Sequence, residues 1–137
     1  MNEEDGSMDW PGVTAVICTR GDRPEYLRET IAAIVAQDYP GEVATLVVFD
    51  GAAPDRDLVS DAPGRPVRVT GNTRTPGLPG ARNTGVLAAT TELVAFCDDD
   101  DVWYPGKLRA QVRTLAAQPE AIMASCGADS VYDDEVR

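Results

Sequence analysis

Four consecutive aspartates, Asp98, Asp99, Asp100 and Asp101, are the residues of this chain whose type and spacing most clearly suggest chemistry. They directly follow the apolar run 93–97, and a short run rich in β-forming residues predicts a buried strand. Side chains alternate between the two faces of a strand, so we expect Asp98 and Asp100 on one face and Asp99 and Asp101 on the other. Two carboxylates on one face repel each other unless a cation lies between them. A hard divalent cation bound by oxygen ligands is the natural partner.

A solvated acidic loop is the alternative interpretation of this run, because stretches of like charge usually lie on the surface or in disordered tails. Here the aspartates are framed by the expected strand on one side and by Trp103, Tyr104 and Pro105 on the other. This frame disfavours a tail, and the sequence therefore favours a metal site over a plain acidic loop.

The composition limits the classes of function that the chain could have. Its 137 residues, 43% of them hydrophobic, are enough for one domain with a buried core. The net charge of −11 disfavours non-specific binding to nucleic acid and polybasic attachment to anionic lipid. An anionic ligand would therefore need a bound cation or local arginines to attract it.

Cysteine usage and the lack of histidine bear on metal type and cellular compartment. The chain has no histidine, and Cys18, Cys97 and Cys126 form no Cys-x-x-Cys pair, so a zinc site of the Cys/His type is disfavoured. Free thiols in a reducing compartment are expected instead. Residues 1–10 lack the apolar stretch of a signal peptide, and no apolar run approaches membrane-spanning length. These features predict a cytoplasmic protein.

Strand and helix patterns alternate along the chain, which predicts an α/β domain with a mainly parallel sheet flanked by helices. Residues 1–12 are expected to be a disordered lead-in, and residues 13–137 to form one domain. Asp22, with Glu25 three positions later, has the pattern of a capping box at the start of the first helix. We expect strands at 13–18, 44–49, 67–69, 93–97 and 121–126, and helices between 22 and 39, over 81–89 and between 105 and 118.

Polar residues follow several of these strands at their carboxyl ends. Thr19, Asp50 and the aspartate run 98–101 all occupy such positions. Open parallel sheets bind ligands outside the carboxyl ends of their strands, so we expect these side chains to converge on one crevice. No Gly-x-Gly-x-x-Gly motif follows the first strand, which disfavours a dinucleotide-binding domain.

Five motifs occur in order between residue 13 and about residue 118. They are the opening strand and turn at 13–20, a helical stretch ending in Gln-Asp-Tyr-Pro at 37–40, a strand ending in Asp50-Gly51, the run Ala-Arg-Asn-Thr-Gly at 81–85, and the Asp-rich segment 96–108 with its Trp, Pro and Lys-Leu. Together they resemble the nucleotide-sugar-binding half of family 2 glycosyltransferases, whose Rossmann-like fold is called GT-A. Phe49-Asp50-Gly51-Ala52 departs from the family's Asp-Asp-Gly-Ser.

The resemblance implies transfer of a sugar from a nucleotide-diphosphate sugar, a UDP-sugar, to an acceptor hydroxyl with inversion and with help from a metal. It implies a DXD motif in which Asp100, supported by Asp98, holds Mn²⁺ or Mg²⁺. A surface salt bridge for Arg82 and a turn-forming role for Asp50 are the alternatives to ligand binding at those positions. The residues that the resemblance implies for binding the nucleotide sugar are Thr19, Arg20, Asp50, Arg82, Asp98 and Asp99.

The resemblance also implies an acceptor-binding half and a general base beyond Arg137, so we expect an incomplete version of the family's fold. The activity of this chain alone is left open. So are the acceptor, which could be a glycan, a lipid or a small molecule, and any association with a membrane surface or a partner chain. The alternatives are a non-catalytic nucleotide-binding remnant and a nucleotidyltransferase-like domain. The latter would need a glycine-rich, basic first loop, and residues 19–24 offer only Arg20, Gly21 and Arg23.

Overall fold

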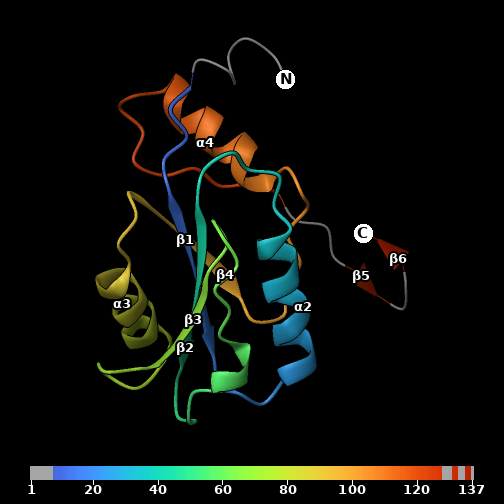
Figure 1. The fold of residues 1–137 in the computed structure, drawn as a ribbon, viewed down its shortest axis with the longest axis vertical. Helices are drawn as coiled ribbons and strands as arrows, with labels where there is room; N and C mark the ends of the chain where they lie inside the picture. Colours follow the sequence, from blue (N-terminus) through green and yellow to red (C-terminus); the bar gives the residue numbers. More distant parts are fainter. Residues whose placement is uncertain (1–7, 128–130, 133–134, 137) are drawn as a thin grey trace.

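The computed structural model describes residues 8–127, 131–132 and 135–136 of the chain. A four-stranded parallel sheet with the order β3-β2-β1-β4 lies between α3 on one face and α2 on the other (Figure 1). A separate antiparallel pair joins β5 (Val131–Tyr132) to β6 (Glu135–Val136). The other elements are β1 (Val13–Thr19), α2 (Pro24–Val35), β2 (Val43–Phe49), the 3₁₀ turn η1 (Arg56–Leu58), β3 (Val67–Gly71), α3 (Leu78–Ala88), β4 (Leu93–Asp98) and α4 (Lys107–Ala117).

The two central strands, β1 and β2, are apolar along nearly their whole length because both of their faces are covered. Ala15 and Ile17 of β1 belong to the larger core cluster, which includes residues of α2 and α4. Val16 lies between them in sequence and packs in a second cluster with Ala81 of α3. These contacts confirm the predicted α/β architecture and the predicted burial of the first strand.

The close packing of α3 on β1 depends on a glycine. A Cβ atom added at Gly85 would lie 2.3 Å from Cγ1 of Val16, which is too close for any side chain. Gly85 weakens the helix by its own propensity, yet it lets the backbone of α3 approach the sheet. This approach places the first turn of α3 beside the carboxyl ends of the strands (Figure 1).

The start of α2 differs from the prediction. Arg23, and not Asp22, is the residue that caps the helix, and no side chain accepts a hydrogen bond from the first turn. The predicted capping box of Asp22 and Glu25 is therefore wrong. The physical reason is that the chain enters the helix one residue later, with Pro24 in the first turn and Asp22 lining a cavity outside it.

The last predicted strand, residues 121–126, is also wrong, because this segment has no strand structure. Ile122 and Met123 are 98% and 79% exposed, and the segment pairs with no strand among the described residues. As a result β4 is an edge strand among the described residues. Phe96 on this strand is 49% exposed, whereas the sequence predicted full burial.

The stretch that precedes β1 is packed where it is described. Residues 8–12 belong to the lead-in that we expected to be disordered, and residues 1–7 of it lie outside the described part of the chain. Trp10 meets Tyr39 edge to face, with 5.3 Å between the ring centroids. The hydroxyl of Tyr39 donates to the carbonyl of Pro11, and burial raises the pKa of Tyr39 to about 12. Within the described residues, no helix is long and apolar enough to cross a bilayer.

Candidate functional site

The register of the sheet brings the predicted polar residues together at one edge. Thr19 at the end of β1 pairs with Phe49 of β2, and Cys18 pairs with Asp98 of β4. The N–H of Asp50 donates to the carbonyl of Thr19 at 2.8 Å, which continues the ladder past the end of β2. The convergence expected from the sequence is therefore present.

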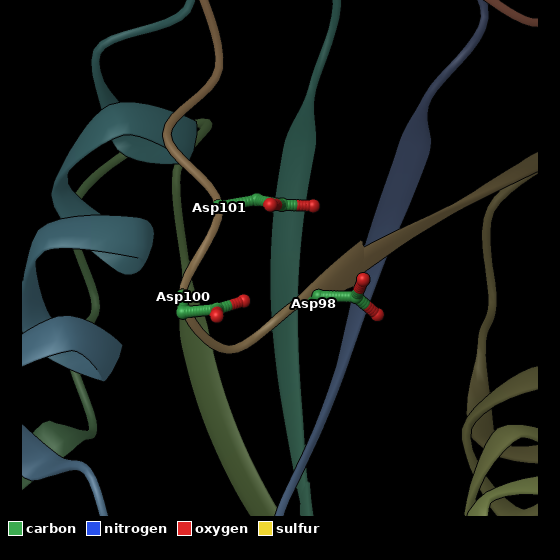
Figure 2. A group of neighbouring side chains, drawn as sticks. All are labelled: Asp98, Asp100 and Asp101. Atoms are coloured by element: carbon green, nitrogen blue, oxygen red, sulfur yellow. The ribbon is translucent and has the colours of Figure 1, made fainter. Parts of the chain in front are cut away.

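Three of the four aspartates form a carboxylate cluster. One oxygen from each of Asp98, Asp100 and Asp101 lies within 4.8 Å of the other two, and all three residues are exposed. Figure 2 shows Asp98 at the end of β4 and the other two on the segment that follows. Because β4 ends at Asp98 and the chain turns there, strand alternation does not extend further. The predicted separation of Asp101 from Asp98 and Asp100 is wrong.

The donor set of this cluster fits a hard divalent cation, because it consists entirely of carboxylate oxygens. Partial burial raises the pKa of Asp101, and the charges of Asp98 and Asp100 raise it further. This mutual repulsion is what a bound cation would relieve. Mg²⁺ and Mn²⁺ both accept such ligands while leaving positions for phosphate oxygens.

Asp99, in contrast, is buried and engaged within the protein. It is 5% exposed, and its Oδ2 accepts a hydrogen bond of 2.8 Å from the hydroxyl of Thr19. Its Oδ1 accepts from Nη2 of Arg23, whose Nη1 also donates to Asp100 at 3.0 Å. The N–H of Gly21 donates to the Thr19 hydroxyl at 3.0 Å. Asp99 therefore joins the end of β4 to the end of β1 and the start of α2, and its predicted contact with a nucleotide sugar stays a prediction.

We expect Thr19→Val to destabilise the fold although it keeps the side-chain shape. The substitution removes the hydrogen bond to the buried Asp99 carboxylate and the acceptor for Gly21 N–H. The free energy of unfolding should fall by about 2 kcal/mol, as is typical for hydrogen bonds to charged groups. Urea denaturation followed by circular dichroism measures this change.

Thr45→Val is the matched control on the neighbouring strand. Its hydroxyl is buried and has no hydrogen-bond partner within the described part of the chain. Removing an unsatisfied buried hydroxyl should leave the protein as stable as before or stabilise it by about 1 kcal/mol. Equal destabilisation by the two substitutions would contradict the role assigned to Thr19.

Asp50 anchors the loop that leads into α3. Its Oδ1 accepts from Nδ2 of Asn72 at 3.0 Å, and its Oδ2 accepts from the N–H of Gly77 at 3.1 Å. Asn72 is itself held by the hydroxyl of Thr84, 2.9 Å from its Oδ1. These hydrogen bonds reach across to residues 72–77, so Asp50 does more than form the turn with Gly51, the alternative that the sequence left open. They lower the pKa of Asp50, with a further contribution from Arg20.

The lowered pKa of Asp50 predicts a pH dependence of stability. A carboxylate whose pKa is lower in the folded state stabilises the fold above its unfolded pKa, near 3.8, and loses that contribution as the pH falls through the folded value. Asp50→Asn should therefore be less stable than the wild type at neutral pH, and the difference should shrink at about pH 3. Urea midpoints of both proteins at the two pH values measure it, and a difference that does not change with pH would count against these hydrogen bonds.

A cavity of about 460 Å³ opens at this edge of the sheet, which is a normal size for a small-molecule site. Arg20 and Arg23 supply positive charge to a wall whose other charged residues are all aspartates. Of the predicted residues, all except Arg82 reach it. The lining consists of Cys18, Thr19, Arg20, Asp22, Arg23, Asp50, Leu78, Ala81, Asp98, Asp99 and Asp100.

Arg82 lies on α3 with its guanidinium carbon 5.7 Å from the centroid of the Phe96 ring. This cation–π contact differs from both interpretations offered by the sequence, a phosphate neighbour and a surface salt bridge. The charge of Arg82 still acts on the cavity wall. It lowers the pKa of Cys18, although burial dominates and raises that pKa overall.

Sequence reasoning missed Arg23 and Asp101 as members of the site. Arg23 reaches the aspartates only because α2 begins beside the ends of β1 and β4. The available signal was its place between a strand end and a helix start, where open α/β sheets bind their ligands. Asp101 could not be found from strand alternation, because the alternation ends with the strand.

The parallel sheet flanked by helices, with polar side chains at the carboxyl ends of its strands, defines a class of fold, the GT-A fold of glycosyltransferases. The model of the glycosyl transferase family 2 matches residues 14–136, and the chain belongs to this family. It is 34% identical over 106 residues to an uncharacterized glycosyltransferase of Nostoc sp., covering 74% of this chain and 32% of that protein. It is 33% identical over 109 residues to the succinoglycan biosynthesis protein ExoO of Rhizobium meliloti, covering 78% and 30%.

A solved structure has the same fold. The mannosyltransferase PcManGT from Pyrobaculum calidifontis, in complex with GDP-Man and Mn²⁺, superimposes with a TM-score of 0.63 and 23% sequence identity. The match covers 83% of this chain and 37% of that one. The chain thus spans about a third of the length of the relatives it matches.

Proposed function

We propose that this chain is the donor-binding region of a metal-assisted glycosyltransferase, which transfers a sugar from a UDP-sugar to an acceptor hydroxyl with inversion. The observation that carries the proposal is the cluster of Asp98, Asp100 and Asp101, of which Asp98 and Asp100 line a cavity that also contains two arginines. A diphosphate carries more negative charge as the sugar leaves, and it would meet an acidic wall here. A divalent cation held by the three carboxylates supplies the missing positive charge and stabilises the leaving group.

The residues of the chain have separate roles in this proposal. Asp98, Asp100 and Asp101 would hold Mn²⁺ or Mg²⁺, the choice between them being open to test. Arg20 and Arg23 line the cavity, and guanidinium groups suit phosphate oxygens. The complex of PcManGT with GDP-Man and Mn²⁺ supports a metal-bound nucleotide sugar in this fold.

The geometry of Asp50 favours uracil as the base. A carboxylate can accept about four hydrogen bonds, and Asn72 and Gly77 already use part of that capacity. Uracil offers a single ring N–H, whereas guanine offers an N–H and an amino group side by side and needs two free acceptors. Cytosine has an acceptor at the same ring position and would be repelled by the carboxylate.

Direct displacement at the anomeric carbon inverts it and requires a base to take the proton of the acceptor hydroxyl. We propose that this base belongs to the acceptor-binding region of the family and that the acceptor is a glycan, a lipid or a small molecule. The location in the cytoplasm stays a prediction from the sequence.

Calorimetric titration with UDP, GDP and CDP, each with Mn²⁺ or with EDTA, tests the proposal. UDP should bind in the presence of Mn²⁺ and at least about tenfold more weakly without it, because the cation screens phosphate from the acidic wall. GDP and CDP should bind more weakly than UDP. Equal binding of all three with EDTA would contradict both the metal role and the role of Asp50. Transfer of a labelled sugar to water or an acceptor would separate an enzyme from a non-catalytic remnant.

A further inference from the structure

Arg23 bridges two aspartates that have different surroundings. Its Nη2 donates to the buried Asp99, and its Nη1 donates to the exposed Asp100 at 3.0 Å. The side chain of Asp99 is 7% exposed, whereas that of Asp100 is 43% exposed. Thr19 also donates to Asp99, so this carboxylate is held from two sides. The contact with Asp100 is therefore the weaker of the two.

A divalent cation and Arg23 would compete for Asp100. The guanidinium occupies Oδ2 of Asp100, and a cation bound with Asp98 and Asp101 needs the same carboxylate. Two cations that share one small carboxylate repel each other at short distance. Binding of the metal should thus weaken the solvent-exposed contact first and leave the contact with Asp99 in place.

We propose that Arg23 is a positioning residue that holds Asp100 in the metal-free protein and is released to the cavity when a divalent cation binds. The freed Nη1 then donates to a phosphate oxygen of the ligand, while Nη2 remains on Asp99. Arg23 lines the same cavity as Asp50 and Arg20. Its guanidinium would therefore reach the ligand by rotation of the side chain alone. This inference rests on the proposed function. It adds a coupling between the two ligands, in which metal binding frees Nη1 of Arg23 to bind a phosphate oxygen.

Titration of Mn²⁺ alone, followed by electron paramagnetic resonance of the free ion, tests the competition. Arg23→Gln should bind Mn²⁺ about two- to fivefold more tightly than the wild type, the effect expected from losing one partly exposed ion pair. At saturating Mn²⁺, the same variant should bind UDP more weakly than the wild type. Arg28→Gln is the control, because Arg28 lies on the same helix and pairs with Asp55 at 3.7 Å, away from the cluster.

Nitrogen-15 spectra of the arginine side chains in the wild-type protein give an independent readout that needs no substitution. Addition of Mg²⁺ should shift the guanidinium signal of Arg23 and leave that of Arg28 in place. An unshifted Arg23 signal in a protein that binds Mg²⁺ would overturn the inference.

The remaining outcomes separate the two proposals. If the wild type binds Mn²⁺ and UDP together but Arg23→Gln binds Mn²⁺ no more tightly than Arg28→Gln, the inference about Arg23 fails and the proposed function stands. Tighter Mn²⁺ binding with unchanged UDP affinity would overturn the phosphate contact. A wild type that binds no Mn²⁺ would contradict the proposed function and the inference together.

Discussion

Replacing Asp100 by Asn is expected to abolish the dependence of UDP binding on Mn²⁺. The amide keeps the shape of the side chain but removes the negative charge from the middle member of the cluster. The affinity for Mn²⁺ should fall by more than about tenfold, since even the loss of an outer hydrogen-bond partner of a metal ligand commonly costs that much. Calorimetric titration of Mn²⁺, and then of UDP in its presence, measures both effects.

Asp61→Asn is the control for this change, because it removes the same unit of charge. Asp61 pairs with Arg68 and follows Ser60, which bridges to the first residue of β3. It therefore lies near the amino ends of the strands, whereas the cluster lies at their carboxyl ends. If both substitutions weakened UDP binding equally, a general charge effect would replace the metal site as the explanation.

Replacing Gly80 by Ala should lower the free energy of unfolding by about 2 kcal/mol. Overpacking at a rigid contact destabilises the fold by more than the higher helix propensity of alanine stabilises it. A Cβ atom at this position would lie 1.8 Å from the carbonyl oxygen of Thr75, and backbone cannot move aside as a side chain can. The same carbonyl accepts from Nδ2 of Asn72, which also donates to Asp50. The substitution should thus disturb the loop that holds Asp50 and weaken UDP binding as well.

Gly106→Ala serves as the comparison for this second substitution. Gly106 precedes α4, has an ordinary φ of −92°, and a Cβ there would meet no atom within 4 Å. Its replacement should leave stability and UDP binding nearly unchanged. Urea denaturation measures the stability of both variants. A Gly80→Ala protein as stable as Gly106→Ala would show that the backbone at Thr75 moves aside without loss of stability.

The fold was predictable from the local sequence pattern where a strand is apolar and buried along nearly its whole length. The nearly continuous apolar runs of β1 and β2 predicted buried strands, and both faces of these strands are covered in the structure. The alternation of strands with helices predicted the parallel sheet. Residues 121–126 show the limit of this reasoning. Their composition favours a strand, but a strand also needs a partner, and among the described residues no strand pairs with this segment.

The position of the site at the carboxyl ends of the strands was predictable, whereas the side-chain contacts within it were not. Thr19, Asp50 and Asp98 lie at strand ends, and topology alone brings such residues together. The roles of Asp99 and Asp101 depend on where β4 stops and how the chain turns, and neither follows from alternation. Arg23 contacts Asp99 and Asp100 across more than 70 positions of sequence. Its place between a strand end and a helix start indicates that it lies near the site, but does not indicate that these two aspartates are its partners.

The central claim is that Asp98, Asp100 and Asp101 hold a divalent cation in contact with the diphosphate of the donor. Electron–nuclear double resonance of bound Mn²⁺ with UDP tests it directly, because a large isotropic phosphorus coupling requires a phosphate oxygen to ligate the ion. We predict a ³¹P coupling in the wild-type protein that is lost in Asp100→Asn. Bound Mn²⁺ without ³¹P coupling, or a coupling that is the same in both proteins, would contradict the claim.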